Sequence, residues 1–172
     1  MKTTMTLGGI GPRLALICLP YIVLSLSVMY HYPEFLNLVF LDLASVKLFA
    51  YFWLFLGSSF WAYSAITFLR GFMKGRLITW GPYAFCRNPI YASVIIFIIP
   101  AFALIFHSGI LFSVALALYI GFKLSIHGER IVLYKTFGEA YEQYEKSVYE
   151  LFPVPVFYWK NNSVPGRVLK SS

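Results

Sequence analysis

One short stretch of the chain combines residue types that can bind an anion. Arg87, Asn88 and Pro89 follow one another, and Tyr91 lies four residues after Arg87. Asparagine followed by proline is typical of the start of a helix. A helix start exposes unpaired N–H groups, and an arginine beside it can hold a carboxylate with two hydrogen bonds. The stretch is therefore a candidate site for an anionic ligand group. A membrane-flanking arginine beside an ordinary helix cap would give the same pattern.

A second polar stretch starts at Glu129, directly after an apolar segment. An acid in that position is disfavoured unless it has a partner or a function. The neighbouring Arg130 is the structural alternative, because it could neutralise Glu129 without any ligand. Further along, apolar and aromatic residues recur at helical spacing: Leu133, Phe137, Tyr141, Tyr144 and Val148. We expect a helix that lies on the inner membrane surface, with a break or bend at Gly138.

The composition indicates which elements position these two stretches. Of the 172 residues, 59% are hydrophobic and 12% are charged, about half the charged share of roughly 25% found in soluble domains. This composition excludes intrinsic disorder, and two distant cysteines do not make a disulfide scaffold. We predict an all-α integral membrane protein with a single domain over residues 1–172.

Four apolar segments predict about four transmembrane helices, at residues 14–30, 48–69, 90–106 and 109–124. The link between the last two is very short, so they should form a helical hairpin. We place a cytoplasmic amphipathic helix at about 128–150 and a tail at 151–172. Basic residues alternate between the loops in a way that puts both termini and the candidate site in the cytoplasm. The net charge of +7 fits membrane lipids as partners, and we predict no nucleic-acid partner, no metal site and no particular oligomeric state.

Together the two stretches resemble the membrane methyltransferases related to isoprenylcysteine carboxyl methyltransferase and the phospholipid N-methyltransferases. The family pattern is G-x-Y-x-x-x-R-H-P-x-Y, then a helical hairpin, then E-E-x-x-L-x-x-x-F-G-x-x-Y-x-x-Y. The matching residues are Gly81, Tyr83, Arg87, Pro89 and Tyr91, followed by Glu129, Leu133, Phe137, Gly138, Tyr141 and Tyr144. Asn88 stands where the family has histidine, and Arg130 where it has a second glutamate. The match covers roughly residues 79 to 153.

The resemblance implies S-adenosylmethionine (SAM) as the methyl donor and a lipid-linked or membrane-dissolved acceptor, preferably one like an isoprenylcysteine carboxylate. Arg87, with the helix start at Asn88 and Pro89, would hold the SAM carboxylate. Glu129 would accept hydrogen bonds from the ammonium group or the ribose hydroxyls. Arg87 and Glu129 are therefore the predicted catalytic residues. Four tyrosines would stack on adenine or face the sulfonium: Tyr83, Tyr91, Tyr141 and Tyr144.

Two other functions stay open at this point. A membrane sterol or steroid reductase that uses NADPH has a similar Arg-His-Pro-like turn, although such proteins are generally longer. The 2′-phosphate of NADPH would have to bind a small basic cluster, which consists of Arg70, Lys74 and Arg76. A non-catalytic membrane scaffold of the same fold is favoured by Asn88 and Arg130. The only histidine near the site is His127, so no convincing general base is present, which favours an acceptor that is already ionised.

Overall fold

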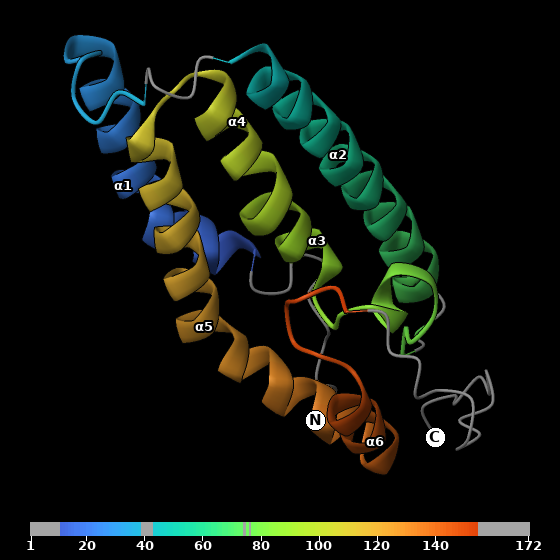
Figure 1. Cartoon of the computed structure of the whole chain (residues 1–172). Helices are drawn as coiled ribbons and strands as arrows, with labels where there is room; N and C mark the ends of the chain where they lie inside the picture. The colour runs from blue at the N-terminus through green and yellow to red at the C-terminus, as the bar shows by residue number, and fades with distance from the viewer. Residues whose placement is uncertain (1–10, 39–42, 74, 76, 155–172) are drawn as a thin grey trace.

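The computed structural model is a bundle of helices, and its described part contains no strand (Figure 1). The structure describes residues 11–38, 43–73, 75 and 77–154. The three long helices are α1 (Gly11–His31), α2 (Ala44–Phe72) and α5 (Gly109–Phe137). A fourth helix consists of α3 (Pro89–Ala92), the π-helical η3 (Ser93–Ile98) and α4 (Ile99–Ile105). The short helices η2 (Gly81–Ala84) and α6 (Glu139–Ser147) flank it in the sequence.

The Pro89–Ile105 helix lies in the middle of the bundle. It packs against α2 on one side and α5 on the other, and α1 packs against α5 (Figure 1). The end of α5 and the short α6 extend beyond the bundle, at the end where α1 begins and α2 finishes. The helices α4 and α5 are joined by a short link and pack against each other, as expected for the predicted hairpin.

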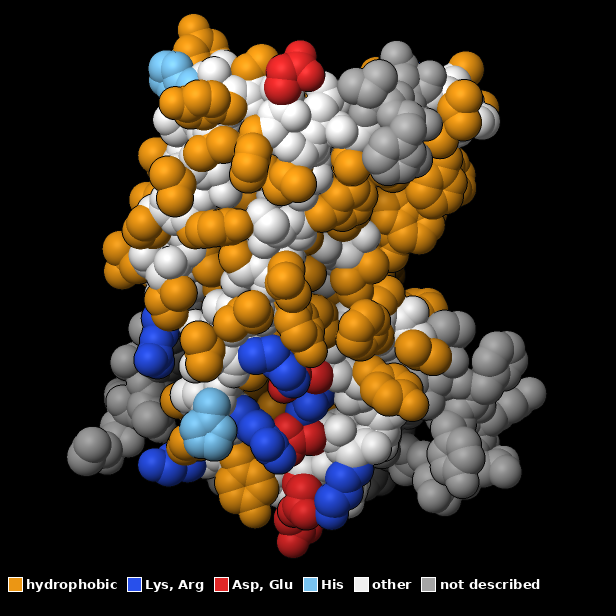
Figure 2. All heavy atoms as spheres, turned by 60° about the vertical axis from the view of Figure 1, so that its left-hand side comes forward, with side chains coloured by type: hydrophobic (Ala, Val, Ile, Leu, Met, Phe, Trp, Pro, Cys, Tyr) orange, Lys and Arg blue, Asp and Glu red, His pale blue; other side chains and the backbone are white. Residues whose placement is uncertain are grey.

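Within the described residues, three helices are long and apolar enough to cross a membrane: Gly11–His31, Ala44–Gly71 and Gly109–Phe137. The Pro89–Ile105 helix is shorter. At 1.5 Å per residue it covers about 25 Å, somewhat less than the roughly 30 Å of a hydrocarbon core. Hydrophobic side chains cover most of the bundle in Figure 2, whereas most charged side chains gather near one end. The structure therefore supports the predicted all-helical class, with helices suited to a membrane.

Two predicted boundaries near the end of the bundle are wrong. We expected the fourth apolar segment to end at residue 124 and a separate helix to cover 128–150. Instead α5 continues unbroken to Phe137, and α6 covers only Glu139–Ser147. The first charges after the apolar run change the surroundings of the helix without interrupting its backbone hydrogen bonds. Of the predicted tail at 151–172, the part from residue 155 onward lies outside the described residues.

The Pro89–Ile105 helix depends on α2 for one of its backbone hydrogen bonds. Pro100 has no N–H, so it cannot donate to the carbonyl of Ile96 four residues earlier. The indole of Trp53 on α2 donates to that carbonyl at an N···O distance of 3.1 Å. One turn further along α2, a Cβ added at Gly57 would come within 2.5 Å of the Cβ of Phe97. The π-helical turn therefore lies where α2 packs tightly against it and supplies a hydrogen-bond donor.

α1 and α5 also approach each other closely, at Gly121. A Cβ added there would lie 2.6 Å from the sulfur of Cys18 and 3.0 Å from Cδ1 of Leu14. Small residues permit this kind of close packing between membrane helices. Tyr21 and Ser113 add a hydrogen bond between the two helices, with an O···O distance of 2.7 Å.

We expect Gly121→Ala to destabilise the protein by about 1–3 kcal/mol, because the added methyl group overpacks the contact with Cys18. Gly128→Ala is the matched control on the same helix, since a Cβ there meets no atom within 4 Å. That variant should be neutral or stabilising, because alanine forms helices better than glycine by about 1 kcal/mol. Thermal unfolding in detergent measures both effects, and equal unfolding temperatures for the two variants would contradict the packing described here.

Candidate functional site

A pocket opens at the end of the bundle, where α6 lies against α5. It contains about 770 Å³ of empty space, which includes open solvent at its mouth. Its polar lining consists of Tyr83, Arg87, Asn88, Glu129, Arg130, Tyr141, Tyr144 and Glu150. Its larger apolar lining residues are Phe68, Leu77, Ile78, Ile126, Leu133 and Phe137.

Most of the residues predicted from the sequence meet in this pocket. Tyr83 belongs to η2, Arg87 and Asn88 to the turn before α3, Glu129 to α5, and Tyr141 and Tyr144 to α6. The two other predicted residues, Pro89 and Tyr91, are not among the residues that line it. Pro89 is fully buried, and the ring of Tyr91 packs against Phe122 of α5 with ring centroids 5.5 Å apart.

Gly138 places α6 beside the pocket. Its backbone, at φ 55° and ψ −131°, adopts a conformation that is open essentially only to glycine. Its N–H donates to the carbonyl of Tyr134 at 2.8 Å and so closes the last turn of α5. The break predicted at Gly138 is therefore confirmed. Because the chain bends here, Tyr141 and Tyr144 pack with Leu133 and Phe137 of the preceding helix.

The turn that carries Arg87 is fastened to a segment near the end of the described chain, residues 148–151, here called the strap. The N–H of Arg87 donates to the carbonyl of Tyr149 at 2.8 Å, and the N–H of Asn88 donates to the carbonyl of Glu150 at 3.1 Å. The Asn88 side chain also donates to that carbonyl, at 3.0 Å. The predicted helix start at Pro89 is confirmed, but the Asn88 side chain holds the strap and does not cap the helix.

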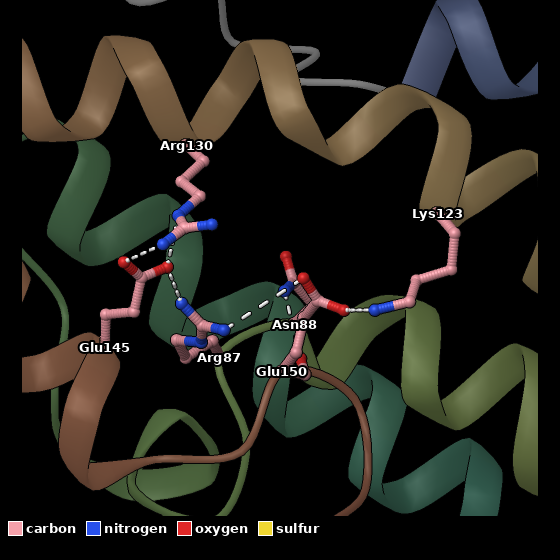
Figure 3. Close-up of polar contacts among 6 residues, drawn as sticks. All are labelled: Arg87, Asn88, Lys123, Arg130, Glu145 and Glu150. Atoms are coloured by element: carbon pink, nitrogen blue, oxygen red, sulfur yellow. Dashed lines mark hydrogen bonds and ion pairs between the residues drawn. The ribbon is translucent and has the colours of Figure 1, made fainter.

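Arg87 is itself held by two acids that the sequence analysis did not single out (Figure 3). Its NH1 atom forms an ion pair with Oε1 of Glu145, and its NH2 atom lies 4.0 Å from Oε1 of Glu150. Lys123 of α5 pairs with the other carboxylate oxygen of Glu150. Both terminal nitrogens of the guanidinium that we expected to hold a ligand carboxylate therefore face carboxylates of the protein.

Arg130 also binds Glu145, from the side opposite to Arg87. Its Nε atom lies 2.7 Å from Oε1 of Glu145, and its NH2 atom donates to Oε2 at 2.8 Å (Figure 3). This is the two-pronged geometry that favours arginine over lysine at a carboxylate. Glu145 thus bridges the two arginines. The contact gives a structural reason for an arginine at position 130, where the family that the sequence resembles has glutamate.

Burial and nearby charges set the protonation of the pocket residues. Burial alone would raise the pKa of Glu145, but hydrogen bonds and positive charge from Arg87 and Arg130 lower it below 4.5. Burial raises the pKa of Tyr83, and the nearby charge of Glu129 raises it further. Burial also raises the pKa of Tyr144, whose hydroxyl donates to the carbonyl of Tyr83 at 2.7 Å. At neutral pH Glu145 is therefore ionised and both phenols are neutral.

Cys86 lies beside this pocket and is fully buried. Burial raises the pKa of its thiol to about 12, although a hydrogen bond from the backbone of Asn88 acts in the opposite direction. The reactive form of cysteine is the thiolate. Cys86 is therefore a neutral thiol at neutral pH and serves as a packing residue.

Sequence reasoning missed three charged residues of the site: Lys123, Glu145 and Glu150. A signal for Glu145 was present, because it lies four residues after Tyr141 and three before Val148, both of which are buried. Nothing local indicates that the strap brings Glu150 to Lys123. His127, considered as a base, is exposed on α5 and is not among the lining residues.

Comparisons with known proteins identify no relative: no protein-family model, no curated protein and no solved structure matches the chain. A function must therefore be argued from the pocket and from the residues in it.

The attachment of α6 should weaken in acid. Because the pKa of Glu145 is lowered by folding, its ionised form stabilises the folded state above the ordinary value of 4.5, and this contribution is lost as the pH falls through the lower, folded-state value. We expect the unfolding temperature in detergent to fall less steeply in Glu145→Gln than in the wild type as the pH is lowered from about 6 to about 3.

Glu142→Gln is the control for this pH dependence. Glu142 lies on the same helix and, among the described residues, pairs only with the exposed Lys146 one turn away, a type of contact that contributes little. It should therefore keep the slope of the wild type. Identical slopes in all three proteins would show that Glu145 does not contribute as described.

Proposed function

We propose that the protein is a SAM-dependent methyltransferase that acts on a lipid-linked or membrane-dissolved acceptor. One observation carries the proposal: the two stretches that resemble the methyltransferase family line a single pocket. Arg87 and Asn88 come from one stretch, and Glu129, Tyr141 and Tyr144 from the other. A helical hairpin separates the stretches in the sequence. The chain folds back after this hairpin, and residues of both stretches could therefore contact the same ligand.

The pocket offers a partner for each part of SAM. Glu129 would accept hydrogen bonds from the ammonium group or the ribose hydroxyls, and Arg87 would hold the carboxylate. The rings of Tyr83, Tyr141 and Tyr144 would stack on adenine or face the sulfonium. A cation facing such a ring gains about 0.5–2 kcal/mol.

The apolar lining suits a lipophilic acceptor. Phe68 at the end of α2 and Leu77 and Ile78 after it face the same space as Ile126 of α5. In the reaction, a lone pair of the acceptor attacks the methyl carbon while the bond from carbon to sulfur breaks, and the sulfonium becomes a neutral thioether. Alignment of the two partners and exclusion of water are the main contributions of the protein.

The lining also favours one class of acceptor. A carboxylate or thiolate is already ionised and needs no general base, whereas an ammonium group must first lose a proton. No histidine is among the residues that line the pocket. Of its two carboxylates, Glu150 is paired with Lys123, and Glu129 is assigned here to the donor. The phenols of Tyr83 and Tyr144 cannot act as bases at neutral pH, because their pKa values are raised. We therefore propose an acceptor that reacts as an anion.

We further propose four membrane spans, with both termini and the pocket on the cytoplasmic side. Basic residues stand towards the pocket side of the bundle: Arg13 near the start of α1, Arg70 near the end of α2, Arg87 before α3, and Lys123 in the middle of α5, where its apolar run ends. Basic residues flank membrane helices preferentially on the cytoplasmic side. SAM is a cytosolic metabolite, so the proposed site and its ligand would be in the same compartment.

Cysteine labelling tests this orientation. Gln143 on α6 and Glu34 after α1 are both exposed, whereas the native Cys18 and Cys86 are buried. In intact cells, a membrane-impermeant maleimide should label Glu34→Cys but should label Gln143→Cys only after permeabilisation. The reverse pattern would place the pocket outside, and labelling of both in intact cells would contradict the four-span topology.

Calorimetry with SAM and S-adenosylhomocysteine tests the donor site in detergent-solubilised protein. Glu129→Ala should weaken binding at least about tenfold, because it removes an acceptor for charged or hydroxyl donors. Glu139→Ala is the control, since Glu139 is an exposed acid on α6 outside the pocket lining. Equal affinities in the wild type and Glu129→Ala would disprove the assignment of Glu129.

The same experiment separates the other two functions. Binding of NADPH with no binding of SAM would favour a reductase. Binding of neither compound by folded, monodisperse protein would favour a non-catalytic scaffold, in which Arg87 stays paired with Glu145 and Glu150.

A further inference from the structure

Glu145 is paired with the guanidinium of Arg87, the group that would bind the carboxylate of the proposed donor. One of its oxygens pairs with Arg87, and both of its oxygens bind Arg130, at 2.7 and 2.8 Å. The side chains of Arg87 and Glu145 are only 14% and 15% exposed, so water screens this pair weakly. A carboxylate of α6 thus binds where a ligand carboxylate is proposed to bind (Figure 3).

The contact between Arg87 and Glu145 can nevertheless open without stranding a charge. Removing one partner of a shielded ion pair is costly when the other is left alone. Here Glu145 would keep both of its contacts with Arg130, which is 55% exposed. Arg87 would exchange one carboxylate for another. Its Nε atom is buried and has no hydrogen-bond partner in the described part of the chain, so Arg87 also has a donor to spare for an incoming anion.

We propose that Glu145 competes with the carboxylate of the donor for Arg87, and that Arg130 sets the outcome by holding Glu145. This inference rests on the proposed function, because it assumes a donor that carries a carboxylate. Glu145 and Arg130 are positioning residues in this scheme, since both act through Arg87. Neutralising Glu145 should strengthen donor binding. Neutralising Arg130 should weaken it, because Glu145 would then lose its remaining partner when the donor takes Arg87.

Two ligands make the test specific for the carboxylate. S-adenosylhomocysteine carries the amino-acid group, whereas 5′-methylthioadenosine has the same adenosine and thioether without it. We expect Glu145→Gln to bind S-adenosylhomocysteine about tenfold more tightly than the wild type, and Arg130→Gln to bind it about tenfold more weakly. Affinity for 5′-methylthioadenosine should stay the same in all variants. Calorimetry on the full-length protein in detergent measures both ligands.

A double-mutant cycle tests whether Arg130 acts through Glu145. In the Glu145→Gln background, Arg130→Gln should no longer change the affinity for S-adenosylhomocysteine, because the competitor is already neutral. Glu142→Gln makes the same chemical change on the same helix, at a residue whose ion pair is with the exposed Lys146. It should leave both affinities unchanged.

The outcomes separate this inference from the proposed function. Unchanged or weaker binding of S-adenosylhomocysteine to Glu145→Gln would overturn the competition but leave the donor site in place. An equal shift for both ligands would also overturn it, because the cause would be the shape of the pocket. An effect of Arg130→Gln that persists in the Glu145→Gln background would remove Arg130 from the scheme. If no variant binds either ligand, the proposed donor site and the competition both fail.

Discussion

Charged groups that leave water need opposite charges nearby, and this requirement organises one end of an otherwise apolar bundle. The cost of removing an ion from water is several kcal/mol and is recovered only in a well-formed pair. Glu145 meets the requirement with two arginines, and Glu150 meets it with Lys123. These pairs join α6 and the strap to the rest of the protein. The aromatic side of the pocket depends on them, because the same short helix carries Tyr141 and Tyr144.

Local sequence signals were sufficient wherever a single residue decides the backbone. Proline at position 89 marks a helix start, and glycine at position 138 marks a helix end, and both occur where expected. The predicted end at residue 124 is too early, because the charged residues that follow the apolar run do not end the helix, which continues to Phe137. Gly128 was the only residue there that could have weakened the helix, and it costs about 1 kcal/mol relative to alanine. The π-helical turn was beyond local reasoning, since it depends on Trp53 and Gly57 of another helix.

The site, like the fold, was predictable where local sequence signals decide it and not where it depends on packing between distant segments. Arg87 and Glu129 were identified by residue type and position, and Tyr83 through the family resemblance, and all three line one pocket. Their partners were not identified, because Arg87 and Glu145 are 58 residues apart in the chain. Pairing at that distance is decided by how α6 and the strap pack. Tyr91 shows the opposite error, since its helical spacing from Arg87 suggested a ligand contact but its ring packs in the bundle core.

The balance of charge in this region also bears on which ligand it would accept. Among the described residues of this region, three bases, Arg87, Lys123 and Arg130, stand with three acids, Glu129, Glu145 and Glu150. The amino-acid group of SAM brings one positive and one negative charge, so these two charges would exchange partners and keep the balance. Its sulfonium adds one positive charge, which the tyrosine rings would face. The 2′-phosphate of NADPH would bring only negative charge, to a site where Arg87 and Arg130 are already paired with an acid. Of the proposed Arg70, Lys74 and Arg76 cluster for that phosphate, Lys74 and Arg76 lie outside the described residues, and Arg70 is not among the residues that line the pocket. Charge balance therefore favours a donor with a zwitterionic amino-acid group over a phosphorylated dinucleotide.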